Sequence, residues 1–248
     1  MASQIIKLNN GLETAFIDGN VVSDLAFRPQ FLSNDYSQGR KVLTSIEDEL
    51  LGCDRFYISV AFITLSGIEP LLQTLKELEQ KGIPGQILTT DYLNFSQPKA
   101  LRKLNELSNI ELRMYRTEGS NTGFHTKGYI FQNDGLFRII IGSSNLTANA
   151  LAVNREWNTK IVSTEQGEYS QQVLKEFECF WNSDKAKAFD DFIEAYTLEY
   201  QATKDQQKNA IQFAIPETVR DQFDEFLANY EVEAKAIAEL MCPPKSRV

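Results

Sequence analysis

Residues 124–145 read FHTKGYIFQNDGLFRIIIGSSN, and the architecture of the chain can be worked out from this segment. Apolar side chains dominate 125–132 and 136–142, which predicts two strands. The Asn-Asp-Gly sequence between them is typical of the turn of a β-hairpin. We therefore expect two consecutive strands that pair antiparallel.

Helical and strand-like segments alternate on both sides of this hairpin. Apolar residues at helical spacing predict helices, and short runs rich in β-branched and aromatic residues predict strands. Helices are expected at 39–51, 67–81 and 98–107, from near Asn145, and at 166–182, with strands at 55–62, 86–90, 110–115 and 156–163. This alternation predicts an α/β fold with a mixed, largely parallel β-sheet flanked by helices on both faces.

The chain divides into three segments. Residues 1–34 are expected to be strand-like or irregular and to form an N-terminal arm or hairpin that turns near Gly19. Residues 35–182 form the α/β domain. Residues 183–248 predict a helical C-terminal extension, in which the polar stretch 201–209 has the composition of a linker.

The composition excludes several classes of protein. With 42% hydrophobic and 24% charged residues in 248, the chain is expected to fold as a globular protein. Neither a membrane span nor a signal peptide is recognisable, and the three cysteines form no CxxC pair. We therefore expect a cytoplasmic location, no membrane association, no metal site and no cofactor.

The charge is unevenly distributed. The net charge of −9 argues against nucleic-acid binding if it is spread evenly, because a uniformly acidic surface repels phosphates. Residues 99–160, however, hold nine basic residues against five acidic ones, a net charge of +4, which leaves −13 for the rest of the chain. A nucleic-acid partner is therefore compatible with this middle segment.

His125 is the only histidine, and Lys127 follows it in the expected strand. A single histidine is by itself most often an ordinary surface or core residue. Residues two apart in a strand share one face, however, and a cationic pair is a poor choice for a core. The pair therefore indicates a functional site.

The segment Gly142-Ser143-Ser144-Asn145 follows the second strand of the hairpin. Glycine permits close approach to a ligand, and hydroxyl, amide and helix N-terminal N–H groups suit a phosphate. The alternative is an ordinary helix cap. Glu156 lies eleven residues beyond Asn145 at the start of the next strand, a position where glutamate is usually solvated.

Taken together, His125-x-Lys127, Gly142-Ser143-x-Asn145 and Glu156 resemble the HxK…GSxN…E (HKD) motif of the phospholipase D superfamily. The wider sequence resembles the phospholipase-D-like nuclease domain found in superfamily II helicases and some restriction endonucleases, over about residues 35–182. The acidic residue that follows the lysine in this family is replaced by Gln132. The motif occurs once, whereas the lipases of the superfamily carry it twice.

The resemblance implies metal-independent cleavage of a phosphodiester through a phosphohistidine. One histidine attacks phosphorus and another protonates the leaving oxygen, so a chain with one histidine needs a second copy of itself. A homodimer with a shared site follows. In this mechanism Lys127 and Asn145 bind the phosphate together with Ser143 and Ser144, and Glu156 orients His125.

The leading prediction is a nuclease acting on nucleic acid, DNA in particular, as a module or partner of a helicase or restriction system. The alternative is a nucleic-acid-binding or regulatory module of a helicase-type protein with little turnover. A lipid phosphodiesterase is less favoured, because the sequence contains no basic amphipathic helix with aromatic anchors.

Overall fold

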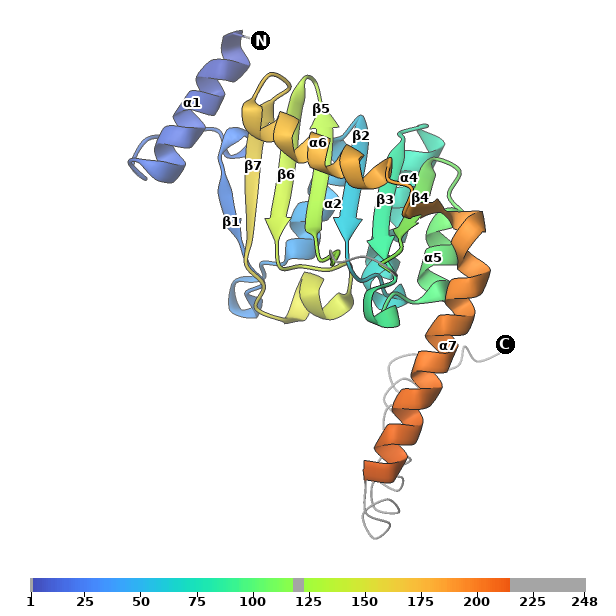
Figure 1. The fold of residues 1–248 in the computed structure, drawn as a ribbon. Coiled ribbons are helices and arrows are strands. Elements are labelled where there is room, and N and C mark those ends of the chain that lie inside the picture. The colour runs from blue at the N-terminus through green and yellow to red at the C-terminus, as the bar shows by residue number, and fades with distance from the viewer. Residues whose placement is uncertain (1, 118–122, 215–248) are drawn as a thin grey trace, which may run out of the picture. The chain divides into compact units, whose positions relative to one another are not determined.

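The computed structural model describes residues 2–117 and 123–214, and its described strands form one sheet (Figure 1). The strands are β1 (Gln30–Leu32), β2 (Arg55–Val60), β3 (Gly85–Thr90), β4 (Ile110–Tyr115), β5 (Lys127–Asn133), β6 (Leu136–Gly142), β7 (Asn158–Thr164) and β8 (Ala186–Ala188). Their order across the sheet is β1-β7-β6-β5-β2-β3-β4-β8. The expected hairpin is confirmed, since β5 and β6 pair antiparallel with Gly128 opposite Ile141.

The mixed sheet is confirmed, but its parallel part is smaller than expected. Only β2, β3 and β4 pair in parallel among the described strands. β5 and β6 are joined by a tight turn at Asp134-Gly135, β7 follows after the longer connection 143–157, and β6 pairs antiparallel with both. β1 and β8 add antiparallel edges.

Most of the helices agree with the sequence. They are α1 (Ala2–Phe16), α2 (Val42–Gly52), α3 (Leu65–Ile68), α4 (Leu72–Gln80), α5 (Pro98–Asn105), α6 (Glu168–Trp181) and α7 (Phe189–Ala214). The single helix expected at 67–81 is wrong, because a 3₁₀ turn at Glu69–Leu71 separates α3 from α4. Pro70 lies in this turn and has no N–H to continue a helical ladder. Among the described residues, no helix combines the length and apolar character that a membrane span requires.

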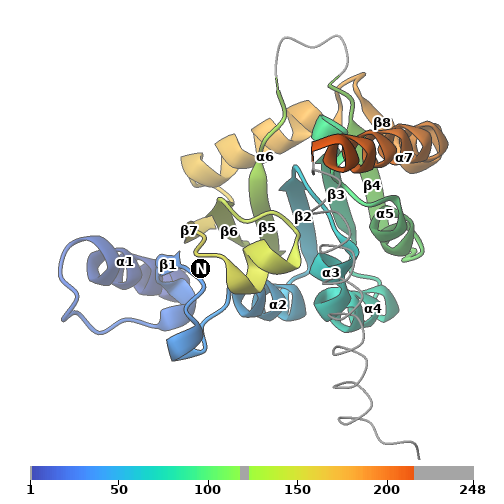
Figure 2. The ribbon, with the colours of Figure 1, turned by 90° about the horizontal axis from the view of Figure 1, so that it is seen from below.

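Helices cover both faces of the sheet (Figures 1 and 2). On one face, side chains of α2, α4 and α5 pack against β2 residues such as Phe56 and Ile58. On the other face, Phe177 and Trp181 of α6 pack against Ile130 and other strand residues. Burial of alternate residues along each strand on two opposite faces explains why the strands are apolar throughout.

The N-terminal segment differs from its prediction. The hairpin expected near Gly19 is wrong, because the chain forms the helix α1 before it reaches β1. Leu8 of α1 packs with Leu136 and Val162 of the sheet, a long-range contact that local sequence patterns do not reveal. β1 itself is an edge strand on β7.

The C-terminal segment also differs. β8 was not expected, and the beginning of α7 contributes Phe192 and Tyr196 to the core. The proposed linker at 201–209 is wrong, since these residues are helical. Contacts divide the chain into compact units of residues 1–200 and 201–248. The first unit thus includes residues 183–200, which the sequence assigns to the extension.

Candidate active site

The candidate residues meet at one edge of the sheet, the lower edge in Figure 1. The pairing directions bring the ends of β2, β3, β4 and β6 to the same edge as the beginnings of β5 and β7. Lys127 is the first residue of β5, and Ser143 follows β6. His125 and Glu156 precede β5 and β7, although the sequence predicts them within strands. The antiparallel meander therefore joins residues far apart in the sequence.

Lys127 lies directly against the imidazole of His125. Its Nζ is 2.8 Å from Nδ1, 3.2 Å from Nε2 and 2.9 Å from the carbonyl oxygen of the same residue. Partial burial disfavours the ammonium and lowers the pKa of Lys127, while the charge of Glu156 opposes this effect. The three side chains are thus electrostatically connected at the edge of the sheet.

The position of His125 is fixed by the residue before it. Phe124 is fully buried, and its ring stacks on Tyr115 at 5.5 Å and meets Phe180 of α6 edge-on at 5.3 Å. His125 itself is exposed. An anchored residue next to an exposed one holds the imidazole at the surface without burying it.

Two aromatic residues that the sequence analysis did not identify flank His125. The ring centroids of Phe62 and Tyr92 lie 6.1 and 6.0 Å from the imidazole, and both approach it edge to face. Phe95 packs on Phe62 at 4.8 Å. Phe62 follows β2, and Tyr92 follows β3. Aromatic residues just after the carboxyl ends of adjacent parallel strands were the available signal, because these ends form ligand sites in α/β folds.

Glu156 is bonded to Ser143. The Ser143 hydroxyl donates to the Glu156 carboxylate, and the N–H of Trp157 donates to the same hydroxyl oxygen at 3.1 Å. Within the described chain no hydrogen bond joins Glu156 to His125. The predicted orientation of His125 by Glu156 is therefore not seen as a direct contact. The charge of Glu156 acts on Lys127, and Lys127 in turn contacts His125.

Asn145 lies at the same edge with its amide oxygen already in use. Its Oδ1 accepts the backbone N–H of Phe62 at 3.1 Å. This bond ties the loop after β6 to the end of β2, where Ile63 and Leu146 form an isolated bridge. The amide nitrogen of Asn145 is the group left to donate to a phosphate.

Ser144 does not have the geometry expected of a phosphate ligand. It is fully buried, and its hydroxyl accepts from the Asn158 amide at 2.9 Å. The Tyr129 hydroxyl donates to the Ser144 carbonyl at 3.0 Å, and burial raises the pKa of that phenol, which keeps it a neutral donor. The prediction that Ser144 binds phosphate is corrected, because the side chain faces the interior and has its own partners.

The helix expected to begin near Asn145 is also not found, because residues 143–147 are not helical. The chain instead forms one π-helical turn at Asn149–Val153. The packing of the strands requires glycine at position 142, since a Cβ there would lie 2.2 Å from the carbonyl oxygen of Trp157. The glycine allows β6 and β7 to approach closely, and the loop that follows holds no helix N-terminus for an anion.

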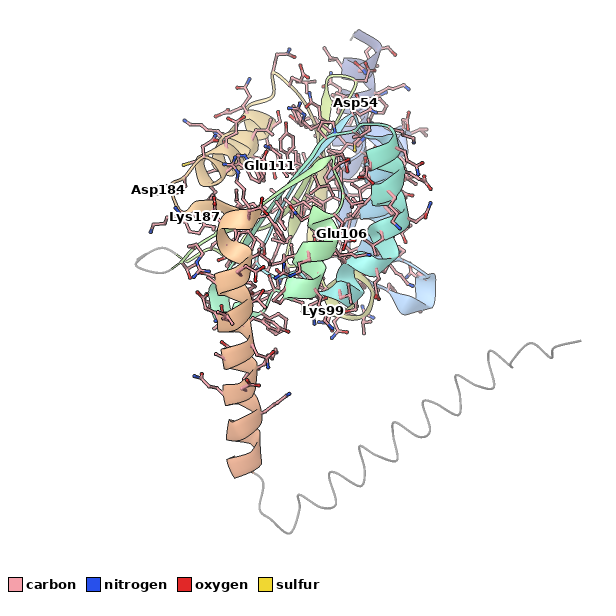
Figure 3. The ribbon with its side chains drawn as sticks, turned by 90° about the vertical axis from the view of Figure 1, so that its right-hand side faces the viewer. Asp54, Lys99, Glu106, Glu111, Asp184 and Lys187 are labelled. Carbon is pink, nitrogen blue, oxygen red and sulfur yellow. The ribbon has the colours of Figure 1, made fainter. Side chains whose placement is uncertain are left out.

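The basic segment does not form a basic surface. All nine basic residues of 99–160 are described, and six of them form ion pairs. Lys103 pairs with Glu106 at the end of α5, on the side of the molecule seen in Figure 3. Glu49 binds both Arg138 and Lys160. The local charge of +4 is thus largely neutralised by carboxylates, several of them from outside the segment.

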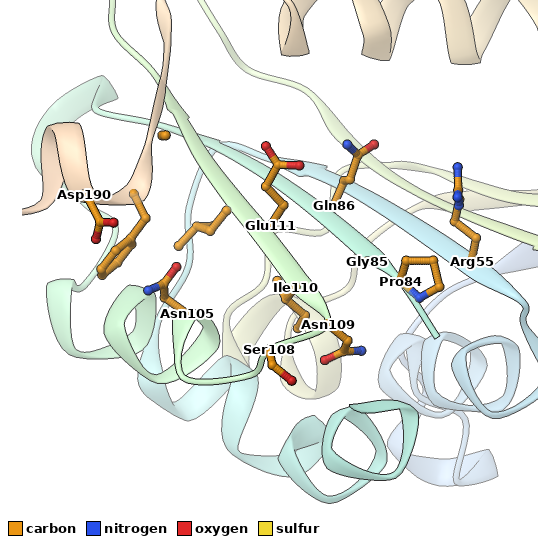
Figure 4. A pocket seen from close by; sticks show the side chains of 13 residues that line it. Arg55, Pro84, Gly85, Gln86, Asn105, Ser108, Asn109, Ile110, Glu111 and Asp190 are labelled. Carbon is orange, nitrogen blue, oxygen red and sulfur yellow. The ribbon is translucent and has the colours of Figure 1, made fainter. Parts of the chain in front are cut away.

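Cavities occur at both edges of the sheet. One of about 540 Å³ lies where β2, β3 and β4 begin, with Arg55, Gln86 and Glu111 on its wall (Figure 4). It contains none of the predicted site residues. Another of about 550 Å³ is lined in part by His125 and Lys127. Among the described residues, no three His, Cys, Asp or Glu side chains are grouped as metal ligands.

A mixed α/β sheet that carries His, Lys, Asn and Glu at one strand edge defines a phospholipase-D-like domain. Residues 53–181 match the family model described as "Cardiolipin synthase, PLD-like domain", which is more than half of the chain. The chain belongs to this family. Residues 134–241 also match the model of the C-terminal region of subunit R of type I restriction and modification enzymes. No curated protein matches the sequence.

Two solved structures resemble the fold. One is NucT from Helicobacter pylori, with a TM-score of 0.52, 17% identity and coverage of 65% of this chain and 99% of that chain. The other is Nuc from Salmonella typhimurium, a phospholipase D family member, with a TM-score of 0.50 and the same identity and coverage. At this identity the likeness concerns the fold.

Proposed function

We propose that the protein is a metal-independent phosphodiesterase that cleaves nucleic acid, DNA in particular, through a phosphohistidine. The proposal rests above all on the contact between Lys127 and both ring nitrogens of the only histidine, at the strand edge of a phospholipase-D-like fold. A cation against a nucleophilic imidazole is an arrangement that can receive a phosphate diester.

The reaction has two steps. A ring nitrogen of His125 attacks phosphorus, the new P–N bond replaces the P–O bond to the leaving group, and a second imidazole donates its proton to that oxygen. Water then attacks phosphorus, gives its proton to the second imidazole and releases His125. Because the chain has one histidine, the second imidazole is His125 of another copy, across a two-fold axis.

The other candidate residues stabilise charge. Lys127 and the Asn145 amide nitrogen are donors for the phosphoryl oxygens as negative charge develops, and the Ser143 hydroxyl becomes a third donor when its proton turns from Glu156 to the phosphate. Glu156 supports the charged state of Lys127 and holds Ser143. In this scheme two copies of each group surround one phosphate and carry out the charge stabilisation that a metal ion performs in other phosphodiesterases.

The test is cleavage of single- and double-stranded DNA and RNA in EDTA. Wild-type protein is expected to cleave, His125→Ala to lose activity by several orders of magnitude, and Lys127→Ala to lose roughly 10²-fold or more. Lys81→Ala, which removes an exposed lysine between α4 and the beginning of β3, at the edge of the sheet opposite the candidate site, is the control. An acid-labile phosphoprotein should be trapped with wild type alone. Equal cleavage by wild type and His125→Ala would end the proposal.

A nucleic-acid-binding module with little turnover is the second candidate. One observation favours it, namely the match of residues 134–241 to the model of a restriction-enzyme subunit. Salt-dependent binding of nucleic acid without cleavage in any buffer would support this candidate. The same assay with cardiolipin vesicles tests a lipid phosphodiesterase, the least favoured candidate.

A further inference from the structure

The cavity beside His125 lies on the face of the sheet that α6 covers. Its walls come from the sheet, with Gly128 and Ile141, and from α6, with Gln172, Glu176, Phe177 and Phe180. α6 crosses this face nearer to the edge opposite the candidate site (Figure 1). Among the described residues, α6 therefore does not cover the strand ends next to His125 on this face, where the cavity lies.

The floor of the cavity is hollowed by a glycine. Gly128 lies opposite Ile141 in the β5–β6 pair, and a Cβ added to it would meet only the Ile141 side chain, at 3.9 Å. Its backbone does not have a positive φ, so the fold does not require glycine there. Ile141 is 38% exposed although β6 lies inside the sheet. The hollow is thus an open apolar surface at the end of two interior strands.

We propose that this cavity binds the nucleobase next to the scissile phosphate and selects bases that carry an exocyclic amino group. This inference rests on the proposed function, since it names the substrate group that accompanies the phosphate. His125 and Lys127 belong both to the cavity and to the candidate site, so a group that fills the cavity lies next to the place proposed for the phosphate.

The chemistry of the lining fits a base better than an acyl chain. Phe177 and Phe180 offer aromatic surface, and the exposed Gln172 and Glu176 lie one helical turn apart at the rim. A carboxylate accepts from the amino groups of cytosine, adenine or guanine, and an amide both donates and accepts. An acyl chain would meet these polar groups without a partner for them, at a cost in free energy. Thymine and uracil offer no amino group to Glu176.

Filling the hollow is the sharpest test. Gly128→Leu places a side chain in the cavity, and Gly52→Leu, at the end of α2 where a Cβ meets nothing within 4 Å, is the matched control. Each is assayed in EDTA on single-stranded oligonucleotides with one cleavable phosphate, either intact or with an abasic unit on one side of it. Wild type and Gly52→Leu should lose roughly 10-fold or more in kcat/KM when the base on one side is missing. Gly128→Leu should be slow on both substrates and indifferent to the base.

The selection of amino bases has its own variant. Glu176→Gln should remove the preference for cytosine, adenine or guanine over thymine at the flanking position, because the amide can also donate. Glu178→Gln, an exposed residue of α6 outside the cavity, should retain it. An unchanged preference in Glu176→Gln would overturn the selection of amino bases.

A binding measurement separates this inference from the proposed function. His125→Ala is mixed with an oligonucleotide that carries 2-aminopurine at the flanking position, and stacking in the cavity should quench the fluorescence. His125→Ala/Gly128→Leu should not quench it. Quenching by His125→Ala combined with no cleavage by the wild-type protein would reject the phosphodiesterase and keep the base site. If wild type cleaves and every variant has the same kcat/KM on intact and abasic substrates, the base site is rejected. It is also rejected if Gly128→Leu changes the oligomeric state of the protein and nothing else.

Discussion

In the proposed mechanism Lys127 stabilises charge, and its partial burial has a cost in stability. Because its folded-state pKa lies below the ordinary value of 10.5, the folded protein binds fewer protons than the unfolded chain between these two values, and stability rises with pH in that window. At lower pH both states carry the ammonium, and the full desolvation penalty remains. This is the expected pattern for a residue selected for function.

Lys127→Met should therefore separate activity from stability. The neutral side chain removes the desolvation penalty, so the thermal midpoint should rise above that of wild type at pH 7 while cleavage is lost. The gain should shrink as the pH approaches the ordinary pKa of lysine. Thermal denaturation of both proteins from pH 6 to pH 10 measures it, with Lys99→Met as control. A lower midpoint at pH 7 would contradict this account of the burial.

The neighbouring serines should respond in opposite ways. Ser144→Ala removes the hydroxyl that accepts from Nδ2 of the buried Asn158, while Oδ1 keeps the backbone N–H of residue 144, and should cost about 1–3 kcal/mol of unfolding free energy with little effect on the chemical step. Ser143→Ala removes an exposed hydroxyl and should lower kcat by roughly 10²-fold at nearly unchanged stability. Urea denaturation and cleavage assays on both variants decide the assignment. The reverse pattern would mean that Ser144 binds the phosphate.

At the scale of elements, the site depends on how closely β6 and β7 approach each other at their ends. Gly142→Ala would place a Cβ 2.2 Å from the Trp157 carbonyl and 2.4 Å from Asn158 Oδ1. We expect a loss of about 1–3 kcal/mol in unfolding free energy together with a large loss of activity, because Ser143 and Glu156 would separate. Gly128→Ala, on the adjacent β5, is the matched control and should leave stability almost unchanged. Equal stability of the two variants would contradict the tight packing.

The sequence predicted the elements whose signals are local. The β5–β6 hairpin was found from its turn, and α5 from Pro98 and its apolar spacing. The helix α1 and the strand β8 were missed because each depends on contacts with distant residues, such as Leu8 with Val162 and Arg113 with Ala188. The helix expected at Asn145 was replaced by a loop that bonds to the end of β2.

The candidate site was predicted in the same uneven way. His125, Lys127, Asn145 and Glu156 could be chosen from their spacing and from the family motif. The burial of Ser144 and the aromatic contacts of His125 could not, because both depend on which strand ends are neighbours. The positive charge of the middle segment was misleading for the same reason, since Glu49 and Glu199 are distant in sequence from the basic residues that they neutralise.

At the scale of the whole molecule, the single histidine makes a prediction about subunit number. If the reaction needs His125 from two copies, mixing wild type with His125→Ala should lower activity more steeply than in proportion. At equal amounts, after subunit exchange, about a quarter of the activity should remain, because only dimers of two wild-type chains are complete. About half of the activity would remain if each chain worked with its own histidine alone. Light scattering on the same samples checks that both proteins form dimers.

One of the two tryptophans is an intrinsic fluorescence probe beside the candidate site. Trp157 follows Glu156 and is 72% exposed, whereas Trp181, the last residue of α6, is 5% exposed and packs against the sheet. Acrylamide should therefore quench one indole readily and the other hardly at all. A polynucleotide or a second subunit that covers this edge should shift the emission of Trp157 to shorter wavelength and shield it, and Trp181→Phe would leave that signal isolated. Occupancy of the site can then be followed without attaching a dye.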